Sequence, residues 1–135
     1  MNRTSIMRSA LWLGALFNFG AALMLAFPAS LGQLAGLPPP GSLFYSWMLA
    51  LLIGLFGGVY LWLAQRATID RPLVVVAIVG KVGVFAVAVA CWQLGQIPGR
   101  GVVPAIGDLI FGLVFLWWLA GEVREHIPSS SGTRG

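Results

Sequence analysis

Four long apolar segments, separated by short stretches rich in turn-forming or polar residues, dominate the pattern of the chain. They cover residues 8–27, 42–64, 72–94 and 101–121. Each is close to the roughly 20 residues that a helix needs to cross the hydrocarbon core of a bilayer. Strands of a membrane barrel would be shorter and would alternate polar with apolar positions. The pattern therefore predicts an all-α protein, a four-helix bundle embedded in a membrane.

Local signals support these boundaries. Pro28 follows the first segment and three prolines, at positions 38–40, precede the second. Pro72 opens the third segment, where a proline suits the first turn of a helix. We expect a single membrane domain over residues 1–127 and a disordered polar tail over residues 128–135.

The start of the chain resembles a secretory signal, because a short basic stretch precedes an apolar run. That run is longer than the usual apolar core of a signal and contains Asn18, and no clean cleavage motif follows it. We therefore expect an uncleaved first span.

Composition agrees with a membrane protein. Of the 135 residues, 59% are hydrophobic and only 9% are charged, whereas soluble domains carry about 25% charged residues. The net charge of +4 comes from scattered arginines and not from a basic patch, which argues against nucleic-acid binding. With one cysteine, Cys91, and one histidine, His126, the chain cannot build a usual zinc site or a bis-histidine haem site. No dinucleotide fingerprint is present, so we expect no cofactor and no metal.

Charge asymmetry predicts the orientation. With four spans, both termini and the connection between the second and third spans share one side. That side carries six arginines, namely Arg3, Arg8, Arg66, Arg71, Arg124 and Arg134, and the other side carries Arg100. Because arginine-rich loops stay in the cytoplasm, both termini are predicted to lie on the cytoplasmic side of the membrane.

Aromatic residues fit the same topology, since amphipathic rings favour the two membrane interfaces. The inner set comprises Trp12, Tyr60, Trp62, Trp117 and Trp118, and the outer set comprises Tyr45, Trp47 and Trp92.

Small residues predict where helices pack, because they let backbones approach closely in lipid. Gly14 lies on the same helical face as Asn18, and Gly54, Gly57 and Gly58 cluster on the second span, where positions 54 and 58 form a GxxxG pattern. We expect these glycines to serve helix packing.

Four polar residues within the spans stand out: Asn18, Lys81, Asp108 and Gln93. Gln93 lies near the outer interface, where hydration explains it, and the other three do not fit lipid. A charge at the bilayer centre costs roughly 2.5–3.5 kcal/mol on insertion scales, so such residues usually face a bundle interior or a wet cavity. Lys81 lies about 14 Å beyond Pro72 at the helical rise per residue, which is too deep for its side chain to reach the interface easily. We expect it to face the interior.

The partner of Lys81 stays open at this point. Asn18 has a similar predicted depth and can accept from the ammonium. Helical side chains lean towards their own N-terminus, so Lys81 is expected to lean inward and Asp108 outward. A direct ion pair then requires helix tilt or an extended lysine, and a water-bridged pair or a bound ligand is an alternative.

The chain resembles small bacterial four-helix membrane proteins of unknown function that are broadly DoxX-like. The resemblance covers the four spans and depends on Gly80-Lys81 and on Gly107-Asp108 followed by Phe111 and Phe115. Some DoxX-type proteins look like small subunits of quinone-linked oxidoreductases, which implies a partner protein that carries the chemistry.

Two classes of function follow. The first is a non-enzymatic membrane protein, either an accessory subunit or a binder of a small amphipathic ligand, with Lys81, Asp108 and Asn18 in its polar interior. The second is a small oligomeric transporter or proton-coupled carrier that uses Lys81 and Asp108 as a switchable pair. A membrane enzyme ranks third, because no catalytic group is evident beside Lys81. The expected partners are the bilayer and either a second protein or further copies of the chain.

Overall fold

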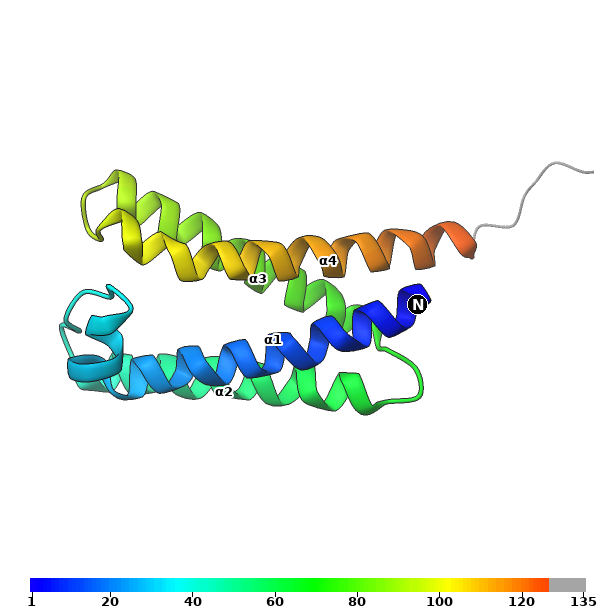
Figure 1. Ribbon diagram of the computed structural model, residues 1–135, viewed down its shortest axis with the longest axis horizontal. Helices are drawn as coiled ribbons and strands as arrows, with labels where there is room; N and C mark the ends of the chain where they lie inside the picture. Colours follow the sequence, from blue (N-terminus) through cyan, green and yellow to red (C-terminus); the bar gives the residue numbers. More distant parts are fainter. Residues whose placement is uncertain (127–135) are drawn as a thin grey trace, which may run out of the picture.

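The structure is a computed structural model that describes residues 1–126, and it consists of four long helices (Figure 1). They are α1 (Arg3–Ala26), α2 (Leu43–Gln65), α3 (Arg71–Gln93) and α4 (Val103–Glu125). Two short helical turns, η1 (Pro28–Gly32) and η2 (Gly99–Val102), lie in the connections, and residues 1–126 contain no strand. All four long helices are long and apolar enough to cross a membrane. The predicted all-α four-helix fold is confirmed, and the predicted tail at 128–135 lies outside the described residues.

Helix starts follow local hydrogen bonding as well as hydrophobicity. The first helix begins at Arg3, before the apolar run, because the Asn2 side chain accepts a hydrogen bond from the Ser5 amide at 2.8 Å. Asp70 caps α3 in the same way, accepting from the Leu73 amide at 3.1 Å. Such caps satisfy backbone donors that the first helical turn leaves free.

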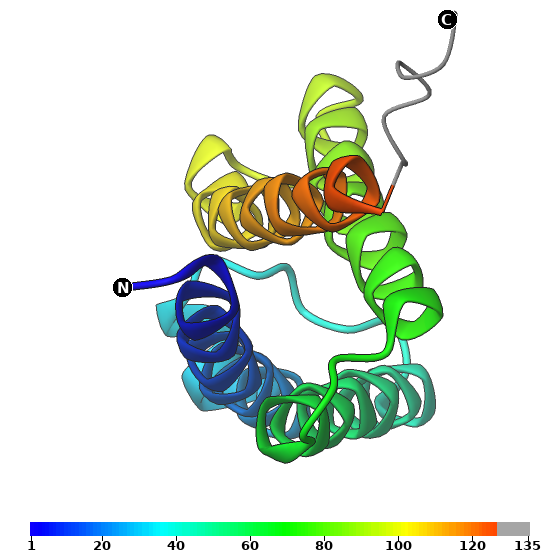
Figure 2. The ribbon, with the colours of Figure 1, turned by 90° about the vertical axis from the view of Figure 1, so that its right-hand side faces the viewer.

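The helices form two pairs. Helix α1 packs along α2, α3 packs along α4, and the pairs meet chiefly through α1 and α4 (Figure 1). Figure 2, seen from the end, shows α3 running obliquely beside α4. The start of α1, the end of α4 and the connection 66–70 lie at one end, here called the terminal end. The connections 27–42 and 94–102 lie at the other, here called the loop end.

The packed core lies in the terminal half of the bundle. The largest fully buried side chains come from all four helices: Met7, Leu11, Leu63, Val74 and Phe115. On α3 the buried positions stop at Lys81, so the remainder of this helix contributes no residue to the core. The bundle is therefore closed from the terminal end up to Lys81 and looser beyond it.

Polar contacts tie the helices together at the terminal end. Arg8 donates to the carbonyl oxygens of Ala64 and Ala67, both at 2.8 Å, and so satisfies acceptors where α2 ends. Arg71 pairs with Glu122 at 3.2 Å and also contacts His126, so these three residues form a charged cluster. Residues 1–126 contain no group of three or more histidine, cysteine, aspartate or glutamate side chains that could hold a metal ion.

Three of the four predicted packing glycines lie at helix contacts. A Cβ placed at Gly14 would lie 3.6 Å from the Tyr60 ring, one at Gly54 would lie 3.8 Å from Ala22, and one at Gly57 would approach the Phe19 ring to 2.9 Å. Gly58 is different, because it is exposed and a Cβ there meets nothing within 4 Å. The prediction for Gly58 was wrong: neighbouring residues lie about 100° apart around a helix, so Gly58 falls beyond the face that Gly57 presents to α1.

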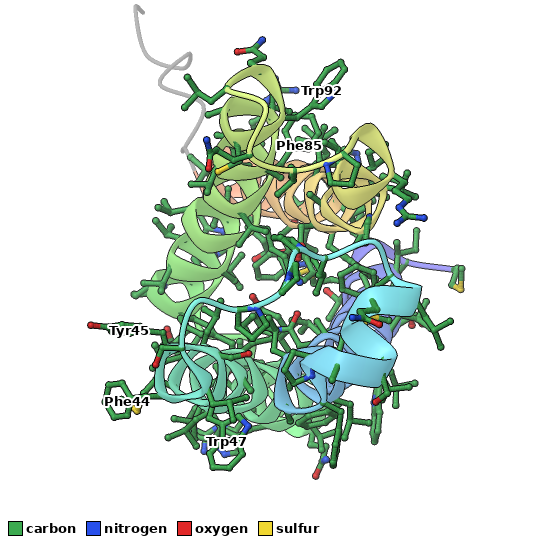
Figure 3. All side chains as sticks on the ribbon, turned by 90° about the vertical axis from the view of Figure 1, so that its left-hand side faces the viewer. Phe44, Tyr45, Trp47, Phe85 and Trp92 are labelled. Carbon is green, nitrogen blue, oxygen red and sulfur yellow. The ribbon has the colours of Figure 1, made fainter. Side chains whose placement is uncertain are left out.

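Two aromatic predictions also need correction. Tyr60 and Trp118, expected at the inner interface, are 2% and 3% exposed and belong to the core. Their distance from the terminal end could be predicted, but the direction in which each ring points depends on packing. At the loop end, Tyr45 and Trp47 point away from the bundle, as interfacial residues should (Figure 3).

Candidate functional site

Asn18, Lys81 and Asp108, here called the polar cluster, come together from α1, α3 and α4. The Lys81 Nζ donates to Asn18 Oδ1 and to Asp108 Oδ1, both at 2.6 Å. Lys81 is 3% exposed, Asn18 is 6% exposed and the Asp108 side chain is 14% exposed. One ammonium therefore joins three helices through charge-assisted hydrogen bonds, which are short and strong.

The expectation that Lys81 and Asp108 lean apart does not hold. Helices α3 and α4 approach closely where Gly112 faces Lys81, since a Cβ at Gly112 would lie 3.3 Å from the Lys81 Cβ. Asp108 lies one turn from Gly112 on the same face of α4, which is about 6 Å along the helix axis. An extended lysine side chain spans that distance. The preferred direction of its first side-chain bond therefore does not fix the position of the ammonium group.

The orientation of Asn18 is fixed by α2. Its Nδ2 donates to the carbonyl oxygen of Ile53 at 3.2 Å, and Oδ1 is thereby turned towards Lys81. The close approach of α1 to α2 at Gly57 makes this contact possible, because a Cβ there would lie 3.2 Å from the Asn18 Cβ. The same small residue that packs the two helices thus also positions a polar group.

Three aromatic rings surround the ammonium, and the sequence reasoning missed this arrangement. The Lys81 Nζ lies 5.1 Å from the centroid of Phe17, 5.4 Å from that of Tyr60 and 5.4 Å from that of Phe111. Each ring lies within the range of a cation–π interaction. Phe111 follows Asp108 by one helical turn and Phe17 adjoins Asn18, so both rings could have been suspected from spacing. Tyr60 could not, because it was placed at the interface.

A cavity of about 270 Å³ adjoins the polar cluster. Its polar wall consists of Asn18, Lys81, Asp108 and Tyr60. The apolar wall is formed by Ala21, Leu49, Leu52, Ile53, Phe56, Gly80 and Val84. Leu52 and Val84 are 51% and 46% exposed, so the cavity reaches the surface between α2 and α3. Both residues lie near the middle of their helices, at the level where lipid tails would contact the protein.

A second cavity, of about 480 Å³, lies at the loop end beneath the proline-rich connection. It is lined by the first turns of α2, the end of α1 and residues 37–42. Leu49 lines both cavities and therefore lies between them. The first cavity differs from the second in that buried charged groups lie in its wall.

Comparisons with known proteins identify no relative: no family model, no curated protein and no solved structure matches the chain. The resemblance to DoxX-like proteins therefore stays a prediction.

Proposed function

We propose that the protein is a multi-pass, non-enzymatic membrane protein that binds a small amphipathic molecule in the cavity between α2 and α3. The observation that carries the proposal is a buried polar cluster in the wall of an apolar cavity that opens at mid-height. The head group of the ligand would contact the polar cluster, and its apolar part would lie against α2 and α3.

The position of the opening supports a ligand that arrives through the bilayer. Leu52 and Val84 flank the opening, and lipid tails would surround both residues. A molecule dissolved in the bilayer can enter there without crossing water. Ligand sites are typically apolar with a few well-placed polar groups, which matches the composition of these walls.

The looseness of α3 supports the same proposal. A lysine that served only to hold helices together would need no space beside it, and close packing is the rule in protein interiors. Here the buried positions of α3 end at Lys81, and the cavity begins at Gly80 and Lys81.

We further propose that the protein lies in a bacterial cytoplasmic membrane with both termini inside. Five arginines of the described chain, Arg3, Arg8, Arg66, Arg71 and Arg124, belong to the terminal end, and Arg100 belongs to the loop end. This asymmetry is typical of cytoplasmic and external loops, respectively.

Two glycines of α3 allow a matched test of the binding site. Gly80 lines the cavity and Gly83 does not, and a Cβ at either position meets nothing within 4 Å. Gly80→Leu should fill the opening, whereas Gly83→Leu adds the same side chain to an exposed surface of α3. We expect small molecules extracted from the purified protein, measured by mass spectrometry, to include one species close to equimolar with the chain. Gly80→Leu should reduce it at least about tenfold, which corresponds to about 1.4 kcal/mol.

The Gly83→Leu protein should retain this species at the level of the unsubstituted protein. Equal retention in the two variants, or no enriched species in any preparation, would argue against a ligand site between α2 and α3.

A further inference from the structure

We infer, on the basis of the proposed function, that the head group of the ligand is uncharged and carries both a hydrogen-bond acceptor and a donor. Amides, alcohols and protonated carboxylic acids belong to this class. The inference follows from the charge of the cavity wall and from the hydrogen-bonding groups that the polar cluster leaves unused.

The charges in the wall already balance. Within residues 1–126, Lys81 and Asp108 are the only lysine, arginine, aspartate or glutamate residues that line the cavity, and they pair directly. An ionic head group would add an uncompensated charge to a site whose other walls are largely apolar. Burying a charge without a partner is far more costly than burying a neutral polar group that is hydrogen-bonded. An uncharged head group avoids this cost.

The polar cluster leaves both donors and an acceptor unused. A lysine ammonium has three N–H donors, and within residues 1–126 two of them reach an oxygen, those of Asn18 and Asp108. Asn18 uses one amide N–H for Ile53, and Asp108 accepts from Lys81 through Oδ1. One ammonium N–H, one amide N–H and Asp108 Oδ2 therefore have no hydrogen-bond partner in the described chain. The three rings near the ammonium are weaker partners than an oxygen would be.

These unused groups determine which hydrogen-bonding groups the ligand needs. A carbonyl or hydroxyl oxygen can accept from Lys81 or Asn18, and an N–H or O–H of the same head group can donate to Asp108. The Tyr60 hydroxyl is a further polar group of the wall, and the other lining residues can only contact apolar atoms. The cavity of about 270 Å³ would hold about nine waters at roughly 30 Å³ each. This volume suits a head group and the first part of a chain, and a longer chain would extend out between Leu52 and Val84.

A competition between three probes with the same dodecyl chain tests the inference. The probes are dodecanamide, which is neutral and has both an acceptor and a donor, dodecanesulfonate, which is anionic, and dodecyltrimethylammonium, which is cationic. The full-length protein in nanodiscs is incubated with equal, submicellar amounts of the three, and the bound probe is identified by native mass spectrometry. We expect the amide to be bound about tenfold more than either ion, the ratio that 1.4 kcal/mol produces.

Two variants test whether the charge balance of the cavity wall causes the preference for the neutral probe. Asp108→Asn leaves the charge of Lys81 unbalanced and should shift the preference to the sulfonate. Lys81→Met leaves the charge of Asp108 unbalanced and should shift the preference to the trimethylammonium probe. A role of the pair in stability alone would not reverse the preference in opposite directions. If either variant fails to fold, the ranking for the unsubstituted protein still decides the inference.

The possible failures are distinguishable. Preferential binding of either ion by the unsubstituted protein overturns the inference and leaves the proposed function standing. Equal binding of the three probes also overturns the inference alone. The same holds if none of the probes binds while Gly80→Leu still removes the copurifying species. Binding of none, with no difference between Gly80→Leu and Gly83→Leu, removes the proposed function itself.

Discussion

The Lys81 ammonium is stabilised by groups from each of the other three helices. Asn18 and Asp108 supply oxygens at 2.6 Å, and the rings of Phe17, Tyr60 and Phe111 lie within 5.4 Å. Each hydrogen bond to a charged group contributes about 1.5–3 kcal/mol, which is comparable with the roughly 2.5–3.5 kcal/mol cost of a lysine at the centre of a membrane helix. A lysine at this position is thus compatible with a stable fold.

A first prediction concerns the pairing of Lys81 with Asp108. Lys81→Met should lower the free energy of unfolding by about 3–5 kcal/mol, because removal of one partner leaves the other as an uncompensated buried charge. The double variant Lys81→Met/Asp108→Asn should recover part of that loss, since neither residue is then charged. Reversible unfolding in mixed detergent micelles measures both values. Val79→Met, at a position of α3 that is 67% exposed, should change stability by less than about 0.5 kcal/mol. A double variant that is less stable than Lys81→Met would contradict the pairing of Lys81 with Asp108.

At the scale of helices, small residues decide which faces meet and so also position the polar cluster. Gly57 brings α1 and α2 together beside Asn18, and Gly112 brings α3 and α4 together beside Lys81. Without these approaches the cluster would be spread over helices too far apart to share one ammonium. The same glycine contacts therefore pack the helices and place the polar cluster.

A second prediction compares neighbouring glycines of α2. Gly57→Ala should destabilise the protein by about 1–3 kcal/mol, because the added methyl group would contact Phe19 at 2.9 Å and force a shift in a packed interface. Gly58→Ala adds the same methyl group where nothing lies within 4 Å. It should be neutral or stabilise the protein by up to about 1 kcal/mol through helix propensity. Thermal unfolding of the two variants in the same detergent distinguishes them, and equal effects would show that Gly57 is not a tight contact.

For the whole molecule, the two ends differ in charge and in packing. The terminal end carries five arginines of the described chain and the closed core, and the loop end carries Arg100 and outward-pointing aromatic residues (Figure 3). A protein partner or an assembly of several copies stays a prediction. The orientation in the membrane can be tested directly.

A third prediction concerns this orientation. Green fluorescent protein fused to the C-terminus should fluoresce, and alkaline phosphatase at the same position should be inactive, because its disulfides form only outside the cytoplasm. Fusions after Gly95, in a connection at the loop end, should give the reverse pattern. Active phosphatase at the C-terminus would place the termini outside.

Much of the architecture could be predicted from the sequence, because a bilayer imposes a strong and local constraint. Twenty or so apolar residues in a row have few alternatives to a spanning helix, and the four segments found in this way correspond to α1, α2, α3 and α4. Lys81, Asp108 and Asn18 stood out for the same reason, since a polar side chain within an apolar span is evident without any structure.

How these residues meet could be learned only from the packing of the helices. Direct contact between Lys81 and Asp108 depends on the approach of α3 to α4 at Gly112, and the burial of Tyr60 depends on how α2 is rotated. The hydropathy pattern predicts neither the distance between two helices nor the rotation of a helix about its own axis. Both depend on how many side chains fit together at once. The order of apolar and polar residues along the chain is thus enough to predict which helices form and which polar residues lie within them. Packing alone determined that the polar cluster is a single site, and that a cavity lies beside it.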